Sequence, residues 1–275
     1  MKNRVFLFIT ILCAYFIKAQ TLPQTISDTT FTIGKTVKIK SEILNENREL
    51  NIYLPASYNL DSLKTYPVIY LLDGSKDEDF IHISGIVQFG SFSWINMLPE
   101  SIVVGIANVD RKRDFTYPSK NELDQKEFPS SGKSEKFISF IESELQPYIN
   151  SKFRTTNNTT IIDQSLGGLL ATEILLKKPD LFDNYIIVSP SLWWDDENLL
   201  NFKPINYNNN KSIYIAVGKE GQVMERTAKE LHKKLNSNKK QNTRLLFNFL
   251  ENKTHGDALH IAVYDAFEKI YSSKK

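Results

Sequence analysis

The hydrophobic and polar positions change pattern along the chain, and each pattern predicts a different element. Residues 37–43 and 50–54 alternate apolar with polar side chains, which is typical of an antiparallel hairpin with one buried face. Continuous apolar runs follow, as expected of strands that are covered on both faces. These runs lie at 67–72, 102–106, 160–162, 185–188 and 212–217, and a last candidate strand covers 244–250.

Apolar residues at helical spacing separate the strands. One helix is predicted within 134–149, ending near Pro147, and a second runs through 169–176 and stops at Pro179. Two more are predicted at 224–235 and 258–271, while 108–133 reads as a long polar loop. A hairpin followed by strand–helix alternation predicts an α/β fold, with a mixed, mostly parallel central sheet and helices on both faces.

The first 20 residues differ from the rest. Lys2 and Arg4 precede an apolar run at 5–17, which is short for a membrane span but suits a signal peptide. A membrane anchor is the alternative, and a lipid anchor on Cys13 is disfavoured because Leu12 occupies the preceding position, where a small residue is required. We therefore expect a signal peptide at 1–20 and one domain at 21–275, exported to the periplasm or secreted, with no stable membrane insertion after cleavage.

The amino-acid composition argues against several classes of function. Cys13 is the one cysteine of 275 residues, so a mature chain without it has no thiol chemistry and no cysteine-based zinc site. The four histidines form no H-E-x-x-H arrangement, and we expect no metal. Because 34 Lys and Arg stand against 32 Asp and Glu, the net charge of +2 gives no electrostatic basis for binding nucleic acid.

The sharpest motif is Asp163-Gln-Ser165-Leu-Gly167, which joins an apolar strand directly to an apolar helix. This context is typical of a nucleophile elbow, where a sharp turn exposes a serine hydroxyl at the edge of a sheet. The N–H of Leu166 would then face a developing oxyanion. A plain helix N-cap serine is the alternative. The usual first glycine of the motif is replaced by Asp163, which adds bulk and charge beside the serine.

A serine nucleophile needs a base, and in this topology the acid and then the histidine follow it in the chain. His255 lies in a turn between the last strand and the last helix, where such a base belongs. Glu220, just after the strand at 212–217, is the first choice for the acid, Glu225 is the second, and a dyad without an acid is a third option. Asp257 is expected to cap the last helix.

A second oxyanion donor is expected after the first buried parallel strand, at Gly74 and Ser75. The segments Arg48–Pro55, Pro67–Gly74, Arg111–Pro118, Gln164–Gly168 and Ser189–Trp194 together resemble the esterase branch of the α/β-hydrolases. That branch includes ferric-siderophore esterases, esterase D-like S-formylglutathione hydrolases, feruloyl and acetyl-xylan esterases and mycolyltransferases. The resemblance is strongest to the siderophore-esterase-like subgroup.

The resemblance implies that Ser165 is the nucleophile, His255 the base, and Gly74, Ser75 and Leu166 the oxyanion hole. Glu220 matches the family's acid less securely. It also implies no cofactor and a small-molecule or polysaccharide-linked ester as substrate, such as a siderophore lactone or a feruloyl or acetyl ester.

From the residues themselves, Trp193 and Trp194 are either core aromatics or a wall for an aromatic acyl group. Arg111 and Arg113 either clamp a carboxylate or catecholate or pair with Asp114. The expected function is an exported serine esterase. One alternative is a hydrolase-fold protein that binds a ligand without turnover, which Asp163 and the uncertain acid motivate. The other is an acyltransferase with the same nucleophile. The oligomeric state is left open.

Overall fold

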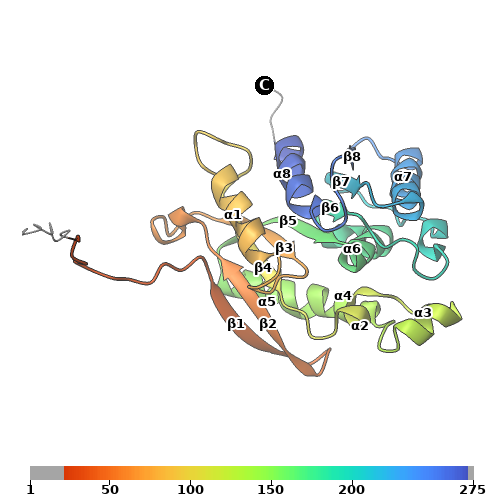
Figure 1. The fold of residues 1–275 in the computed structure, drawn as a ribbon, viewed down its shortest axis with the longest axis horizontal. Coiled ribbons are helices and arrows are strands. Elements are labelled where there is room, and N and C mark those ends of the chain that lie inside the picture. Colours follow the sequence, from red (N-terminus) through yellow and green to blue (C-terminus); the bar gives the residue numbers. More distant parts are fainter. Residues whose placement is uncertain (1–21, 272–275) are drawn as a thin grey trace, which may run out of the picture. The chain divides into compact units, whose positions relative to one another are not determined.

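A central sheet of eight strands organises the computed structural model, which describes residues 22–271 (Figure 1). The strand order is β1-β2-β4-β3-β5-β6-β7-β8. The first two strands pair antiparallel with each other, β2 pairs antiparallel with β4, and all other neighbours are parallel. The strands are β1 (Lys35–Ser41), β2 (Glu46–Tyr53), β3 (Tyr66–Leu71), β4 (Ile102–Ile106), β5 (Thr155–Gln164), β6 (Asn184–Val188), β7 (Lys211–Gly218) and β8 (Thr243–Leu250).

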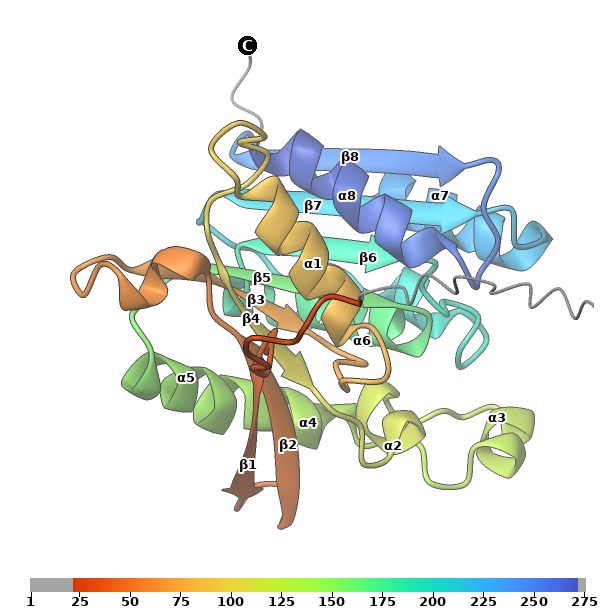
Figure 2. The same ribbon diagram turned by 60° about the vertical axis from the view of Figure 1, so that its left-hand side comes forward.

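Helices cover both faces of this sheet (Figure 2). One face packs against α1 (Phe80–Gly90) and α8 (Ala258–Tyr271). The other packs against α4 (Ser134–Phe140), α5 (Gln146–Lys152), α6 (Leu166–Lys177) and α7 (Gln222–Ser237). The shorter helices are α2 (Arg111–Phe115) and α3 (Glu122–Glu127), and single turns lie at Ala56–Asn59, Pro179–Leu181 and Asn198–Asn201. The predicted α/β fold, with its mostly parallel sheet and N-terminal hairpin, is confirmed.

The two-sided burial follows from the strand sequences. Every residue of β4 and β6 is buried, as the continuous apolar runs predict, whereas β1 alternates exposed and half-buried positions along most of its length. The described residues divide into an extended segment at 22–32 and one folded unit from residue 33 onward. The expected signal peptide at 1–20 lies outside the described residues. Within residues 22–271, no helix has the length and apolar character needed to cross a membrane.

Two predicted boundaries were wrong, for local reasons. The helix expected to end near Pro147 continues to Lys152, because a π-helical turn at Ile141–Leu145 precedes it and Pro147 falls in the first turn of α5, where no backbone N–H is needed. The predicted loop at 108–133 contains α2 and α3. Asp110 caps α2 by accepting from the Arg113 N–H at 3.0 Å, and Asn121 caps α3 by accepting from the Leu123 N–H at 2.8 Å.

Candidate active site

Ser165 lies between the last residue of β5 and the first residue of α6, at the carboxyl end of β5. Its backbone is left-handed, with φ 63° and ψ −124°, a conformation that non-glycine residues seldom adopt. The Ser165 N–H donates to the carbonyl of Val188 at 3.1 Å, which ties the turn to the end of β6. Leu166 is the first residue of α6, where backbone N–H groups have no partner within the helix. The segment thus has the geometry of a nucleophile elbow.

Glu220 and His255 meet on the loops after β7 and β8. Nδ1 of His255 lies 2.6 Å from Oε2 of Glu220. The Glu220 side chain is only 2% exposed, and its hydrogen bonds to His255, Ser189 and Gly218 hold its pKa below the usual value, although burial alone would raise it. The His255 side chain is 48% exposed and therefore open to a substrate. Of the residues considered for the acid, the structure brings Glu220 to the histidine.

The carboxylates of Glu225 and Asp257 make their hydrogen bonds to other groups than His255. Glu225 is on α7 and accepts from the Gly221 N–H at 3.2 Å. Asp257 accepts from the Thr254 N–H at 2.6 Å and from its hydroxyl at 2.9 Å, so it closes the turn that precedes α8.

The histidine loop and the elbow are joined directly. The Gln164 side-chain amide donates to the backbone carbonyl of His255, and Gln164 immediately precedes Ser165. Ser165 Oγ lies 3.3 Å from Ser191 Oγ, and no hydrogen bond joins Ser165 to His255 within residues 22–271. In free enzymes the bond between nucleophile and base is often long or misaligned and tightens with substrate.

The two backbone donors expected in the loop after β3 differ in their present partners. The Gly74 N–H already donates to the Ile106 carbonyl at 3.0 Å, so the expectation that it serves an oxyanion is corrected. A Cβ at Gly74 would lie 2.4 Å from the Cα of Gly105, and this glycine therefore lets the loop approach β4 closely. The Ser75 N–H makes only a long bond, 3.3 Å, to the Glu78 carboxylate, which a substrate oxygen could replace.

Arg111 links this loop to the elbow. Its Nε lies 2.8 Å from both carboxylate oxygens of Asp73, and its Nη2 donates to the Gln164 carbonyl at 3.3 Å. The side chain remains 31% exposed, and its Nη1 makes no hydrogen bond to the part of the chain that the structure describes. Arg113, in contrast, pairs with Asp114 at 2.7 Å and with Glu46, and so contributes to the fold.

The two tryptophans differ in position. Trp194 is 0% exposed, and its indole N–H donates to the Tyr117 carbonyl at 2.9 Å, so it belongs to the core and offers no surface to a substrate. Trp193 is half-buried and packs beside Trp194 and Phe128.

Asp163 is buried at the foot of the elbow. Its Oδ1 accepts from the Gln164 N–H at 2.7 Å, while Oδ2 has no hydrogen-bond partner within residues 22–271. Burial and the nearby carboxylate of Asp73 raise the pKa of Asp163 well above the usual value, and the Arg111 charge opposes this only in part. The bulk that the sequence predicts near Ser165 is therefore present, and the raised pKa disfavours its charged form.

Replacing Asp163 by asparagine is expected to remove a pH dependence of stability. Because the pKa is higher in the folded chain than in the unfolded chain, the folded state holds an extra proton between the two values, and raising the pH above about 4 destabilises it. The stability advantage of Asp163→Asn over wild type should grow as the pH rises above about 4, because only the aspartate loses a proton there and would be left charged in a buried position. Thermal unfolding between pH 4 and 9 measures it, and parallel curves would contradict it.

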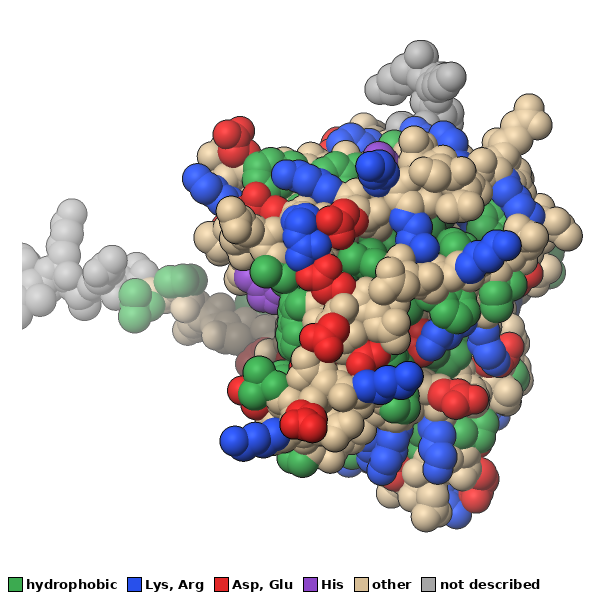
Figure 3. Space-filling model, turned by 90° about the vertical axis from the view of Figure 1, so that its right-hand side faces the viewer, with side chains coloured by type: hydrophobic (Ala, Val, Ile, Leu, Met, Phe, Trp, Pro, Cys, Tyr) green, Lys and Arg blue, Asp and Glu red, His purple; other side chains and the backbone are tan. Residues whose placement is uncertain are grey.

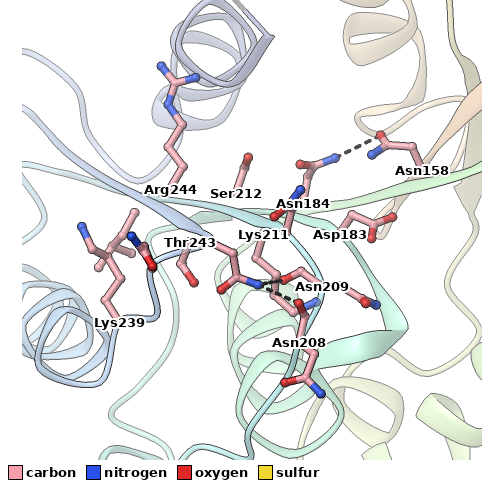
Figure 4. Close-up of a pocket in the computed structure, with 14 residues that line it drawn as sticks. Asn158, Asp183, Asn184, Asn208, Asn209, Lys211, Ser212, Lys239, Thr243 and Arg244 are labelled. Carbon is pink, nitrogen blue, oxygen red and sulfur yellow. Dashed lines mark hydrogen bonds between the residues drawn. The ribbon is translucent and has the colours of Figure 1, made fainter.

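A wide groove lies at the opposite edge of the sheet (Figure 4). It has a volume of about 1140 Å³ and is lined by Asn184, Lys211 and Thr243, the first residues of β6, β7 and β8. Its polar groups bond one another: the Asn184 amide donates to Asn158, and the Asn242 amide donates to two backbone carbonyls. None of the candidate catalytic residues reaches this groove.

Positive and negative side chains are mixed on the surface. On the face shown in Figure 3, Lys and Arg side chains alternate with Asp and Glu, without a continuous stripe of one sign.

Comparison with known proteins identifies the family of this site. The family model described as "Putative esterase" matches residues 41–260. The ferri-bacillibactin esterase BesA of Bacillus subtilis is 31% identical over 272 residues, which is 90% of this chain and 93% of that protein. An IroE-like serine hydrolase from Shewanella oneidensis superposes with a TM-score of 0.76 at 27% identity, covering 86% of this chain and 80% of that one.

A second solved structure, the BES protein from Bacillus cereus, supports the same fold. It superposes with a TM-score of 0.78 at 24% identity and covers 92% of this chain and all of its own. A strained serine elbow, a paired histidine and glutamate on the following loops, and a family match that spans most of the chain lead to one conclusion. The chain belongs to the Putative esterase family of α/β-hydrolases, and it is a carboxylic ester hydrolase.

Proposed function

We propose that this esterase acts through an acyl-enzyme on Ser165, with His255 as general base and Glu220 as the acid that orients it. The observation that carries the proposal is the 2.6 Å pair between His255 Nδ1 and Glu220 Oε2 beside the elbow. Ser165 Oγ forms a bond to the ester carbonyl carbon while its proton passes to His255 Nε2. The N–H groups of Leu166 and Ser75 stabilise the resulting oxyanion. His255 returns the proton to the leaving alcohol, and water then releases the acid.

The proposed substrate is a siderophore lactone. Two features support this class over a general acyl ester. The B. subtilis relative is named for a ferri-siderophore, and Arg111 offers a partly exposed guanidinium beside the elbow. Such a cation suits the negative charge that catecholate groups carry when they hold iron. A feruloyl or acetyl ester remains the competing class.

Hydrolysis of a small panel of esters tests this proposal. The panel is a catecholate trilactone with and without iron, methyl ferulate and p-nitrophenyl butyrate. The trilactone should give the highest kcat/KM, by about 100-fold over p-nitrophenyl butyrate, an advantage of about 3 kcal/mol in transition-state binding. A preference for the ferulate would overturn the siderophore assignment while leaving the nucleophile intact.

Covalent labelling tests the nucleophile independently of the substrate. A fluorophosphonate should form a phosphonyl ester on the Ser165 hydroxyl, with fluoride as the leaving group, and mass spectrometry of the labelled peptide locates it. Ser165→Ala should remain unlabelled. Labelling of another residue, or none in an otherwise folded wild type, would reject Ser165 as the nucleophile.

We also propose that the protein is exported and cleaved near Gln20. The charged residues Lys2 and Arg4 followed by the apolar run at 5–17 support this. The N-terminus of the protein recovered from intact cells and their medium tests it by mass spectrometry. A chain that begins near residue 21 outside the cytoplasm is expected, and an uncleaved chain confined to the cytoplasm would reject export.

A further inference from the structure

The segment Ser189-Pro190-Ser191, which follows β6, touches both ends of the proposed triad. Ser189 Oγ donates to Glu220 Oε1 at 2.5 Å. Two residues later, the Ser191 N–H donates to the Ser165 carbonyl at 3.0 Å, and the two serine hydroxyls lie 3.3 Å apart. One short segment therefore contacts the acid on one side and the nucleophile on the other.

The Glu220 carboxylate has its orientation fixed by donors on both oxygens. Oε2 faces His255 Nδ1, while Oε1 accepts from the Ser189 hydroxyl and from the Gly218 N–H at 2.9 Å. If either donor to Oε1 is lost, less holds the carboxylate against rotation about its last side-chain bond. The Ser189 donor comes from a residue 31 positions away in the chain, so it fixes Glu220 relative to β6 as well as to its own loop.

The backbone of Ser189 is strained. Its side chain is fully buried, and its φ of 43° lies in the left-handed region that favours glycine. Its N–H is held by the Ala216 carbonyl at 2.7 Å. A non-glycine residue is strained in such a conformation and persists only where the surrounding structure holds it there.

The middle residue stiffens the segment against the elbow helix. Pro190 has a fixed φ, and a Cβ added at Gly168 in the first turn of α6 would lie 3.0 Å from the Pro190 Cα. The segment therefore packs closely on the helix that carries the nucleophile.

We propose that Ser189 is a positioning residue, whose hydroxyl holds the Glu220 carboxylate in the orientation that pairs with His255. The inference rests on the proposed function, because it assumes that His255 is the base. Ser189 does not touch the substrate, and its effect on the reaction passes through Glu220 alone.

Two variants separate the hydroxyl from the backbone. Ser189→Gly removes the hydroxyl and relaxes the left-handed φ, whereas Ser189→Ala removes the hydroxyl and keeps the strain. Both should lower kcat for p-nitrophenyl butyrate by about 10-fold, the change expected from losing one hydrogen bond to a charged group, and leave KM within about two-fold. Agreement between the variants assigns the loss to the hydroxyl. If only one of them folds, that one gives the result.

A spectroscopic signature distinguishes positioning from a general loss of structure. The proton between His255 Nδ1 and Glu220 Oε2 should give a downfield NMR resonance in wild type, and this resonance should broaden or disappear in both variants. Ser101→Ala is the matched control, because Ser101 is also a buried serine and its hydroxyl donates to the Pro99 carbonyl at 2.8 Å, away from the site. It should leave kcat and the resonance unchanged.

The outcomes that would overturn the inference are distinct from those that would overturn the esterase mechanism. An active wild type whose Ser189 variants keep both kcat and the resonance rejects Ser189 as a positioning residue. A fall in kcat with an unchanged resonance also rejects it, since the hydroxyl would then act on general stability. A wild type that matches Ser165→Ala in activity rejects the proposed function itself.

Discussion

Ser165→Ala and His255→Ala are each expected to lower kcat for p-nitrophenyl acetate by about 10⁴-fold or more. The two residues act as one unit, because the hydroxyl is a poor nucleophile until the imidazole takes its proton. The double variant should therefore be little slower than either single variant, and the effects should not add. KM should change little, since neither side chain is needed to bind a small ester. Steady-state kinetics on the purified protein measures all three.

Glu220→Gln provides the graded control for this series. The glutamine keeps the size of the side chain but loses the charge that pairs with His255 Nδ1, so the imidazole is less well oriented. We expect a loss of about 10²–10⁴-fold, smaller than that of the nucleophile or the base. Glu225→Gln, on α7, should be close to wild type. A wild type no faster than Ser165→Ala, or a larger loss in Glu225→Gln than in Glu220→Gln, would contradict this arrangement.

The sequence predicted the elbow well because its signal is local. An apolar strand, a serine between small turn residues and an apolar helix are neighbours in the chain, and the structure has β5, Ser165 and α6 in that order. His255 could be placed by chain order alone, since the loop between the last strand and the last helix must reach the carboxyl edge of a parallel sheet. The family match and the sheet topology confirm the fold that these patterns predict.

What sequence reasoning missed depends on contacts between distant residues. The choice between Glu220 and Glu225 turns on which carboxylate reaches His255, more than 25 positions away in the chain, and periodicity carries no such information. The engagement of the Gly74 N–H by the Ile106 carbonyl is equally invisible, since both candidate donors lie on the same turn. From the sequence, Trp193 and Trp194 could belong either to the core or to a substrate-facing surface. Burial of its side chain places Trp194 in the core.

The role of Ser189 had a partial signal. Its segment contributes to the family resemblance, but residue type does not predict the left-handed φ of Ser189, because serine seldom adopts it. A serine kept in a glycine-favouring conformation becomes informative only when its hydroxyl partner, Glu220, is known.

Gly167→Ala is expected to destabilise the fold by about 3 kcal/mol or more. A Cβ at this position would lie 1.3 Å from Asp163 Oδ2 and 2.1 Å from its Cγ, and the Asp163 side chain is fully buried, so relieving this overlap requires a shift within the core. Asp163 thus makes a glycine obligatory four residues later, which the replacement of the motif's usual first glycine did not by itself reveal. Chemical denaturation of Gly167→Ala beside wild type measures the loss.

The double variant Asp163→Gly/Gly167→Ala identifies the cause. The atoms closest to the added methyl group all belong to the Asp163 side chain, so removing that side chain should restore most of the lost stability, with a coupling of at least about 2 kcal/mol between the two positions. Gly85→Ala on α1 is the matched control, because a Cβ there meets no atom within 4 Å, and alanine should be neutral or stabilise the helix by up to about 1 kcal/mol. If the double variant is no more stable than Gly167→Ala alone, the overlap with Asp163 is not what makes this glycine necessary. If it recovers both stability and ester hydrolysis, the elbow tolerates either aspartate or glycine at position 163, provided that residue 167 fits beside it.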